Sequence, residues 1–222
     1  MIEKTQPSKQ VKSRERVADH GEVFTNPREV NAMLDLVKHE TERIDSRFLE
    51  PACGTGNFLA EILRRKLNVV NSRYSKVQLD WEYNTAIAVS SIYGVDILED
   101  NTIECRQRLY DIFEEHYTNL FKDQCKEECQ RSIRFLLERN VLWGDALDFT
   151  NPENKKPIIF AEWGALGNYS FKRRDYKFQF LVQEEYQLTM FNDEEEEVGI
   201  DLPVKDDYPI THFLELGNDA GN

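Results

Sequence analysis

The sequence predicts an α/β fold in which helices cover both faces of a doubly wound parallel sheet. Three observations favour this class. Short apolar runs alternate with longer segments of helical periodicity, a glycine-rich turn joins the first run to a helix, and acidic residues follow the runs. Because ligands of doubly wound sheets bind at the carboxyl ends of the strands, these acidic residues also indicate a binding site.

The first predicted elements surround the glycine turn. A turn at residues 25–27 begins an amphipathic helix whose apolar residues, from Val30 to Val37, share one face. Residues 47–50 then form a short buried strand that enters the turn. The following residues, "NFLAEILRRKLNVV", have helical periodicity. A strand, a glycine turn and a helix in this order open an α/β unit.

Three further apolar runs are predicted to be strands of the same sheet. "SIYGVDILEDN" follows an amphipathic helix at "WEYNTAIAVSS" and ends in Asp96, and residues 101–139 then contain long helical patterns. "VLWGDAL" includes Asp145, and "PIIFAEW" ends near Glu162. "SFKRRDYKFQF" has period-two alternation: it is either a strand with aromatic residues inward and cations outward, or a stretch that contacts a nucleic-acid backbone.

The glycine turn has the chemistry of an anion site. Gly54 and Gly56 allow a tight turn and close approach of a ligand to the backbone, and the helix N-terminus that follows favours a carboxylate or phosphate. The third glycine of the dinucleotide fingerprint is missing, which argues against NAD. Asp96 is suited to accept two hydrogen bonds from a ribose diol, and Asp145 to accept one from an exocyclic amine. Alternatively, each is a solvated residue at the end of a strand.

These residues resemble a known family. "FLEPACGTGNF" at residues 48–58 resembles the cofactor motif of S-adenosylmethionine-dependent DNA adenine-N6 methyltransferases, which include methylase subunits of restriction–modification systems. "GEVFT" at 21–25 is similar to their N-terminal cofactor-contacting segment, in the gamma-type order. "YGVDI" and "LWGDAL" are similar to the next two motifs. The resemblance covers about residues 17–150 and implies a Rossmann-like methyltransferase sheet.

The resemblance also implies a cofactor and roles for individual residues. In such enzymes the cofactor is S-adenosylmethionine, so Glu50 and the turn would contact its methionine end. Asp96 would bind the ribose hydroxyls, Asp145 the adenine amine, and Ile97 would pack on the adenine ring. The residues assigned to the cofactor in this way are Phe24, Thr25, Glu50, Pro51, Ala52, Cys53, Gly54, Gly56, Asn57, Phe58, Asp96, Ile97, Asp145, Ala146 and Leu147.

Catalytic residues are not assigned by the sequence. Enzymes of this family need an Asn/Asp-Pro-Pro-Tyr/Phe motif that binds the target amine and stacks on the flipped-out base. The sequence contains no Pro-Pro pair. Glu162 offers a hydrogen-bond acceptor for the amine, and Trp163 offers a ring for stacking. Asn168 and Phe171 belong to a Gly-Asn-x-x-Phe string that distantly resembles Gly-Asn-Pro-Pro-Phe. For Trp163 the alternative is packing in the core.

The charge of the chain divides it into three predicted parts. The formal net charge is −13, and residues 181–222 hold twelve of the 41 acidic residues but one of the 28 basic residues. We therefore expect a basic flexible arm at 1–16, a cofactor-binding domain at 17–182 and an acidic tail at 183–222. Because acidic residues repel phosphates, we expect DNA to be bound through a partner subunit that supplies target recognition.

The cysteine pattern and hydropathy indicate a cytoplasmic protein. Four cysteines without paired histidines favour free, reduced thiols over a zinc site or disulfides, so no metal is expected. No apolar run is long enough to cross a membrane, and the N-terminus has no secretory signal.

The function expected from the sequence is that of a DNA adenine-N6 methyltransferase or methylase subunit that binds S-adenosylmethionine and depends on a partner. One alternative is a catalytically inactive cofactor-binding or scaffold protein with a methyltransferase-like fold. A weaker alternative is methylation of a substrate other than DNA.

Overall fold

The computed structural model describes Arg16, residues 25–180 and residues 203–218. These residues form a mixed α/β structure with two three-stranded sheets. The strands of the first sheet are parallel and adjacent in chain order, whereas those of the second are antiparallel. The first comprises β1 (Phe48–Glu50), β2 (Ile92–Asp96) and β3 (Val141–Trp143), and the second β4 (Ile159–Leu166), β5 (Ser170–Lys177) and β6 (Thr211–His212).

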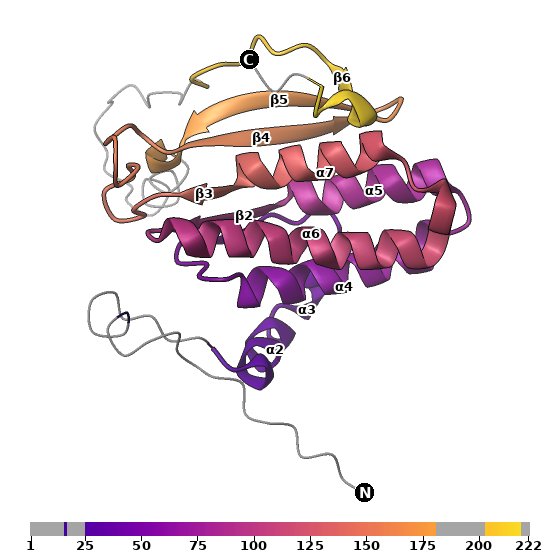
Figure 1. Cartoon of the computed structure of the whole chain (residues 1–222), viewed down its shortest axis with the longest axis horizontal. Coiled ribbons are helices and arrows are strands. Elements are labelled where there is room, and N and C mark those ends of the chain that lie inside the picture. Colours follow the sequence, from indigo (N-terminus) through magenta and orange to yellow (C-terminus); the bar gives the residue numbers. More distant parts are fainter. Residues whose placement is uncertain (1–15, 17–24, 181–202, 219–222) are drawn as a thin grey trace, which may run out of the picture.

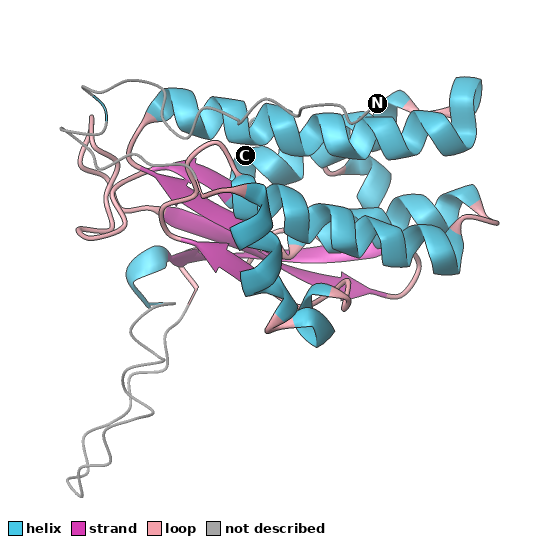
Figure 2. Ribbon diagram, turned by 90° about the horizontal axis from the view of Figure 1, so that it is seen from below, coloured by secondary structure: helices cyan, strands magenta, loops and turns pink. Residues whose placement is uncertain are grey.

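Helices connect the parallel strands, as the sequence predicts. The helical region at 101–139 divides into two helices, and Asn26 caps the helix at 27 by accepting a hydrogen bond from the Arg28 amide at 2.9 Å. The helices are α2 (Pro27–Asp35), α3 (Lys38–Thr41), α4 (Asn57–Tyr74), α5 (Gln78–Ser90), α6 (Glu99–Phe121) and α7 (Glu127–Asn140), with short 3₁₀ helices η1 (Lys122–Gln124) and η2 (Phe213–Glu215). In Figure 2 the axes of the four long helices are roughly aligned with one another.

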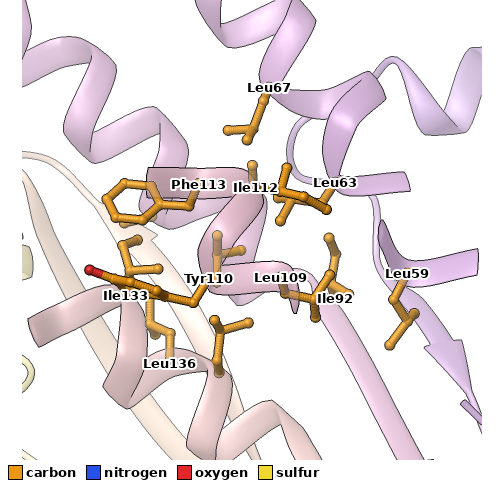
Figure 3. Packing of buried hydrophobic residues seen from close by; sticks show 14 of the residues in the cluster. Leu59, Leu63, Leu67, Ile92, Leu109, Tyr110, Ile112, Phe113, Ile133 and Leu136 are labelled. Carbon is orange, nitrogen blue, oxygen red and sulfur yellow. The ribbon is translucent and has the colours of Figure 1, made fainter. Parts of the chain in front are cut away.

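The main core lies between these helices and the parallel sheet. Leu59, Leu63 and Leu67, four residues apart on one face of α4, belong to one buried cluster with Leu109 and Phe113 of α6 (Figure 3). All five side chains are fully buried. The periodicity visible in the sequence is therefore the contact face of α4.

The fourth predicted strand does not join the parallel sheet, so that prediction is wrong. β4 pairs antiparallel with β5, and in Figure 1 this hairpin lies on the opposite side of the parallel strands from α4 and α6. A parallel strand needs a crossover, usually a helix, to return to the amino edge of the sheet. Residues 144–158 instead fold into a compact loop closed by bridges at Thr150, so β4 starts at the carboxyl edge and runs backwards.

The second face of the parallel sheet is covered by the hairpin. Tyr93 and Val95 of β2 pack against Ile158, Phe160 and Phe178, and the rings of Tyr93 and Phe160 meet edge to face at 5.4 Å. The other face of β2 contacts α4. In the described residues, helices therefore cover one face and a hairpin the other. This differs from the expected doubly wound sheet with helices on both faces.

The strand predicted at 170–180 is confirmed as β5 up to Lys177, and residues 178–180 are helical; the alternation of β5 is not that of an aromatic face and a cationic face. Phe171 and Arg173 share a side, and Arg173 is held at 2.7 Å by Asp175. Residues 203–218, which the sequence assigns to the acidic tail, pack against the hairpin and α7 through the fully buried Phe213. The acidic run at 193–197 and the arm at 1–15 lie outside the described residues.

The structure also shows the state of the cysteines and the apolar character of the helices. All four cysteines are free thiols, and Cys53, Cys105 and Cys129 are buried. Within the described ranges, no helix combines the length and the apolar character that a membrane span needs.

Candidate functional site

Three segments of the chain meet at the carboxyl edge of the parallel sheet. The Cys53 amide donates to the Val95 carbonyl at 2.8 Å, and the Gly54 amide donates to Asp96 Oδ2 at 2.8 Å. On the other side, the Gly144 amide donates to the Asp96 carbonyl at 2.9 Å. The structure therefore places the glycine turn, Asp96 and the residues up to Asp145 side by side, as expected for strands 1, 2 and 3.

The glycines are required by backbone geometry. Gly54 and Gly56 have φ of 52° and 83°, in the left-handed region that favours glycine. Gly56 is also the N-cap of α4, and a Cβ there would lie 2.6 Å from Cys105 Sγ on α6. The amides of Asn57 and Phe58 have no backbone acceptor among the described residues, so they are available to an anion at the helix N-terminus.

Asp96 is held on three sides. Its Oδ1 accepts from the Leu98 amide at 2.9 Å and from Asn101 Nδ2 at 3.2 Å, and its Oδ2 accepts from Gly54. A carboxylate offers about four acceptor sites. Among the described residues no donor occupies the second site on Oδ2, so this site is left for a ligand hydroxyl. With 8% of its surface exposed, Asp96 presents only this oxygen.

Exposed apolar side chains lie next to Asp96 and Asp145. Ile97 is 44% exposed and Leu147 is 91% exposed. The Leu147 amide donates to Asp145 Oδ1 at 2.8 Å, and Trp143 Nε1 donates to the Ile97 carbonyl at 3.0 Å. Ala146 instead packs against the small apolar cluster on β2. Ile97 and Leu147 are therefore the residues that offer apolar surface to a ring.

Residues 50–53 combine an acidic group with packing. Burial raises the pKa of Glu50, whose Oε1 accepts weakly from the Ala52 amide at 3.4 Å. Pro51 and Ala52 are exposed. A hydrogen bond with Cys105, together with burial, raises the pKa of the Cys53 thiol far above its usual range, so Cys53 stays uncharged and fills space under the turn.

Asn57 ties the turn to its surroundings. Its Nδ2 donates to the Thr25 carbonyl at 3.1 Å, and its Oδ1 accepts from Arg108 at 2.6 Å. Both ends of this amide are therefore used within the protein, and Phe58 is partly buried against the core. Phe24, also expected to contact the cofactor, lies outside the described residues.

The candidate catalytic residues lie at the other edge of the sheet. Glu162 forms ion pairs with Arg47 at 2.8 Å and Arg174 at 3.8 Å, and Trp163 donates to Asn140 at 2.9 Å. Arg47 and Asn140 immediately precede β1 and β3, so these contacts mark the amino edge. β2 has five residues at about 3.3 Å each, which separates this edge from the glycine turn by roughly 16 Å.

The remaining two candidates are structural as well. Asn168 has φ of 58° in the turn between β4 and β5, and Phe171 is 1% exposed and packs against Trp163 and Tyr83. Trp163 is itself only 7% exposed. The structure brings none of the four candidates to the turn, because β4 runs away from the carboxyl edge rather than toward it.

Residues of α6 and the N-terminal Arg16 were missed by the sequence analysis. Asn101 donates to Asp96, Arg108 donates to the Thr55 carbonyl at 3.3 Å and to Asn57, and Cys105 packs against Gly56. Arg16 donates to Asn101. Polar residues on a long amphipathic helix look like solvated surface in a sequence, so no local pattern marks them.

Two cavities lie elsewhere on the described surface. One of about 370 Å³ is lined by aromatic residues, among them Trp163 and Tyr208, under the segment that follows residue 203. Another of about 380 Å³ is lined by Trp143 of β3 and Ile103 of α6, so it adjoins the carboxyl edge. Neither is lined by Gly54 or Asp96.

No protein-family model, curated protein or solved structure matches this chain. Within the residues that the structure describes, no group of His, Cys, Asp and Glu side chains is arranged to hold a metal ion. The functional inference therefore depends on the residues at the carboxyl edge of the parallel sheet.

Proposed function

We propose that the chain binds S-adenosylmethionine at the carboxyl edge of the parallel sheet. One observation carries the proposal: the glycine turn, the N-terminus of α4 and the Asp96 carboxylate are joined by the 2.8 Å bond from Gly54 to Asp96. An anion site and an acceptor for a sugar hydroxyl thus lie next to each other. The order β1-β2-β3 with helical crossovers also supports the inference that this sheet is one half of a doubly wound fold.

The residues present suit the parts of this cofactor. The amides of Asn57 and Phe58, which have no backbone acceptor among the described residues, suit its carboxylate, and the acceptor on Asp96 Oδ2 suits a ribose hydroxyl. The exposed Ile97 and Leu147 suit the faces of the adenine ring. When bound, S-adenosylmethionine supplies an electrophilic methyl group on a sulfonium.

The reaction we propose is methylation of adenine N6 in DNA, with this chain as the methyltransferase or as its cofactor-binding subunit. It is supported by the resemblance of "EPACGTGNF" to the cofactor motif of such enzymes. Adenine N6 would attack the methyl carbon directly while the bond from that carbon to sulfur breaks, so S-adenosylhomocysteine would leave, one N6 proton would be lost to solvent, and no covalent enzyme intermediate would form. A partner would supply target recognition.

A second candidate is a cofactor-binding protein without methyl transfer of its own. The observation that favours it is the position of Glu162, Trp163, Asn168 and Phe171, all of which are paired, buried or placed at the amino edge. In that case the chain would serve a partner as a scaffold or cofactor sensor.

Calorimetric titration with S-adenosylmethionine and S-adenosylhomocysteine tests the binding proposal. We expect micromolar affinity, and we expect Asp96→Ala to weaken it about 10- to 100-fold because a hydrogen bond to a charged group is lost. Asp123→Ala, at an exposed position in η1, is the control, and thermal melts establish that each variant is folded. No detectable binding by the folded wild-type chain at millimolar ligand would refute the proposal.

Methyl transfer is tested separately. Radiolabelled methyl incorporation into duplex DNA is measured for the chain alone and with proteins encoded beside it. Transfer to adenine N6 supports the enzyme, whereas cofactor binding without transfer under both conditions supports the second candidate.

A further inference from the structure

A chain of hydrogen bonds links Arg16 to Asp96 through a buried amide. Arg16 Nη2 donates to Asn101 Oδ1 at 3.0 Å, and Asn101 Nδ2 donates to Asp96 Oδ1 at 3.2 Å. The same guanidinium donates to the Asp100 carboxylate from Nη1 at 2.6 Å and from Nη2 at 3.2 Å. Asn101 is 1% exposed, so its amide is shielded from water.

The chemistry at the two ends allows one orientation of this amide. A guanidinium only donates hydrogen bonds and a carboxylate only accepts them. With Arg16 on one side, the oxygen of Asn101 must face the guanidinium and its NH₂ group must face Asp96. Without Arg16, the oxygen of Asn101 would lose this donor, and the amide would be held less firmly against Asp96.

We propose that Arg16 and Asn101 are positioning residues for Asp96, an inference that rests on the proposed cofactor site. Arg16 orients the Asn101 amide, and Asn101 together with the Leu98 amide fills both acceptor sites of Oδ1. The carboxylate is then fixed with the remaining acceptor on Oδ2. Asp96 consequently recognises one ribose hydroxyl, and the affinity for the nucleoside depends on a residue 80 positions earlier in the chain.

The orientation step is tested by a double-mutant cycle on unfolding in urea, which needs no ligand. Arg16→Ala, Asn101→Ala and the double variant are compared, with Arg43→Ala as the matched control because Arg43 forms only exposed ion pairs at the amino edge among the described contacts. Arg16→Ala also removes the pair with Asp100, so it should cost stability in either background; because part of its effect passes through Asn101, we expect it to cost less in Asn101→Ala than in the wild type. Additive losses would overturn the orientation step.

The positioning step is tested by the same variants in titrations with S-adenosylhomocysteine. We expect about tenfold weaker binding for Asn101→Ala, at least threefold for Arg16→Ala, and no further loss in the double variant. Arg16→Lys keeps a donor to Asn101 Oδ1, so it should stay within about twofold of wild type. Arg43→Ala should bind as wild type does.

The 2′-deoxy and 3′-deoxy analogues of the same ligand separate positioning from general stability. We expect one of the two to bind the wild type more weakly, and Arg16→Ala to have no further effect on that analogue. Equal losses with both analogues, or an unchanged effect of Arg16→Ala on each, would overturn the single-hydroxyl role.

The outcomes also distinguish this inference from the proposed function. If the folded wild type binds no ligand while the unfolding cycle shows coupling, the cofactor proposal fails and the orientation step stands. If the wild type binds and the cycles are additive, the positioning inference fails and the cofactor proposal stands. If Asn101→Ala does not fold, the comparison of Arg16→Ala with Arg16→Lys decides.

Discussion

Replacing Gly56 with alanine should destabilise the protein through two separate effects. Gly56 sits at the junction of the glycine turn and α4 with φ of 83°, a conformation that costs a residue with a Cβ about 1–2 kcal/mol. The new Cβ would also lie 2.6 Å from Cys105 Sγ, closer than van der Waals contact allows. Overpacking of this kind costs about 1–3 kcal/mol. We therefore expect Gly56→Ala to lower the free energy of unfolding by about 3 kcal/mol.

The steric effect can be measured separately because the close contact involves a single atom, Cys105 Sγ. In Cys105→Ala the Sγ is absent, and the nearest atom to the new Cβ is the Cβ of residue 105 at 3.5 Å, an ordinary contact. The double variant Gly56→Ala/Cys105→Ala should therefore be about 1–2 kcal/mol more stable than the sum of the single changes predicts. The backbone contribution remains in both.

Urea denaturation followed by circular dichroism measures these free energies. Gly167→Ala is the matched control, because its Cβ would meet no atom within 4 Å, and it should change stability by less than about 0.5 kcal/mol. A Gly56→Ala variant as stable as this control would refute the geometry of the turn. If the losses of stability in Gly56→Ala and Cys105→Ala are purely additive, the proposed clash with Cys105 Sγ is refuted.

Three other perturbations test the interior. Burial lowers the pKa of Lys66 to about 7, so above that pH the unfolded chain binds more protons than the folded chain. The free energy of unfolding should therefore rise by about 2 kcal/mol from pH 7 to 9. Urea titrations of Lys66→Met should lack this rise. Trp163→Phe should cost about 1–3 kcal/mol, since Asn140 loses its donor, yet leave ligand affinity in calorimetry unchanged; a selective loss of affinity would contradict the core role. Glu82→Ala should cost about 2 kcal/mol in the same denaturation assay because Lys126 loses its fully buried partner, and a cost near zero would contradict that contact.

Local patterns in the sequence predicted the elements that are governed by local chemistry. The apolar spacing of α4, the turn at residues 25–27 that begins α2 and the strand at Ile92–Asp96 are visible without tertiary information, since periodicity and turn chemistry depend on nearby residues. The same holds for the turn, because Gly54 and Gly56 mark positive φ. The convergence of Gly54, Asp96 and Asp145 followed from the rule that parallel strands share an edge.

The direction of a strand is not a local property, and the prediction that the fourth strand joins the parallel sheet is therefore wrong. "PIIFAEW" has the composition of a buried strand in either direction. Only the short connection after β3, folded on itself at Thr150, makes β4 antiparallel and carries Glu162 and Trp163 to the amino edge. The predicted catalytic candidates on this hairpin therefore lie away from the glycine turn.

The sequence by itself determined the glycine turn, the strand-end carboxylates and the helices between them, because each depends on neighbours a few residues away. The tertiary structure alone decided how Asp96 is used. Its partners Leu98 and Gly54 fill acceptor sites from two segments, and Asn101, oriented by Arg16, fills a third. The number of hydrogen bonds that a carboxylate has left for a ligand depends on groups brought together by folding, and no spacing in the sequence records it.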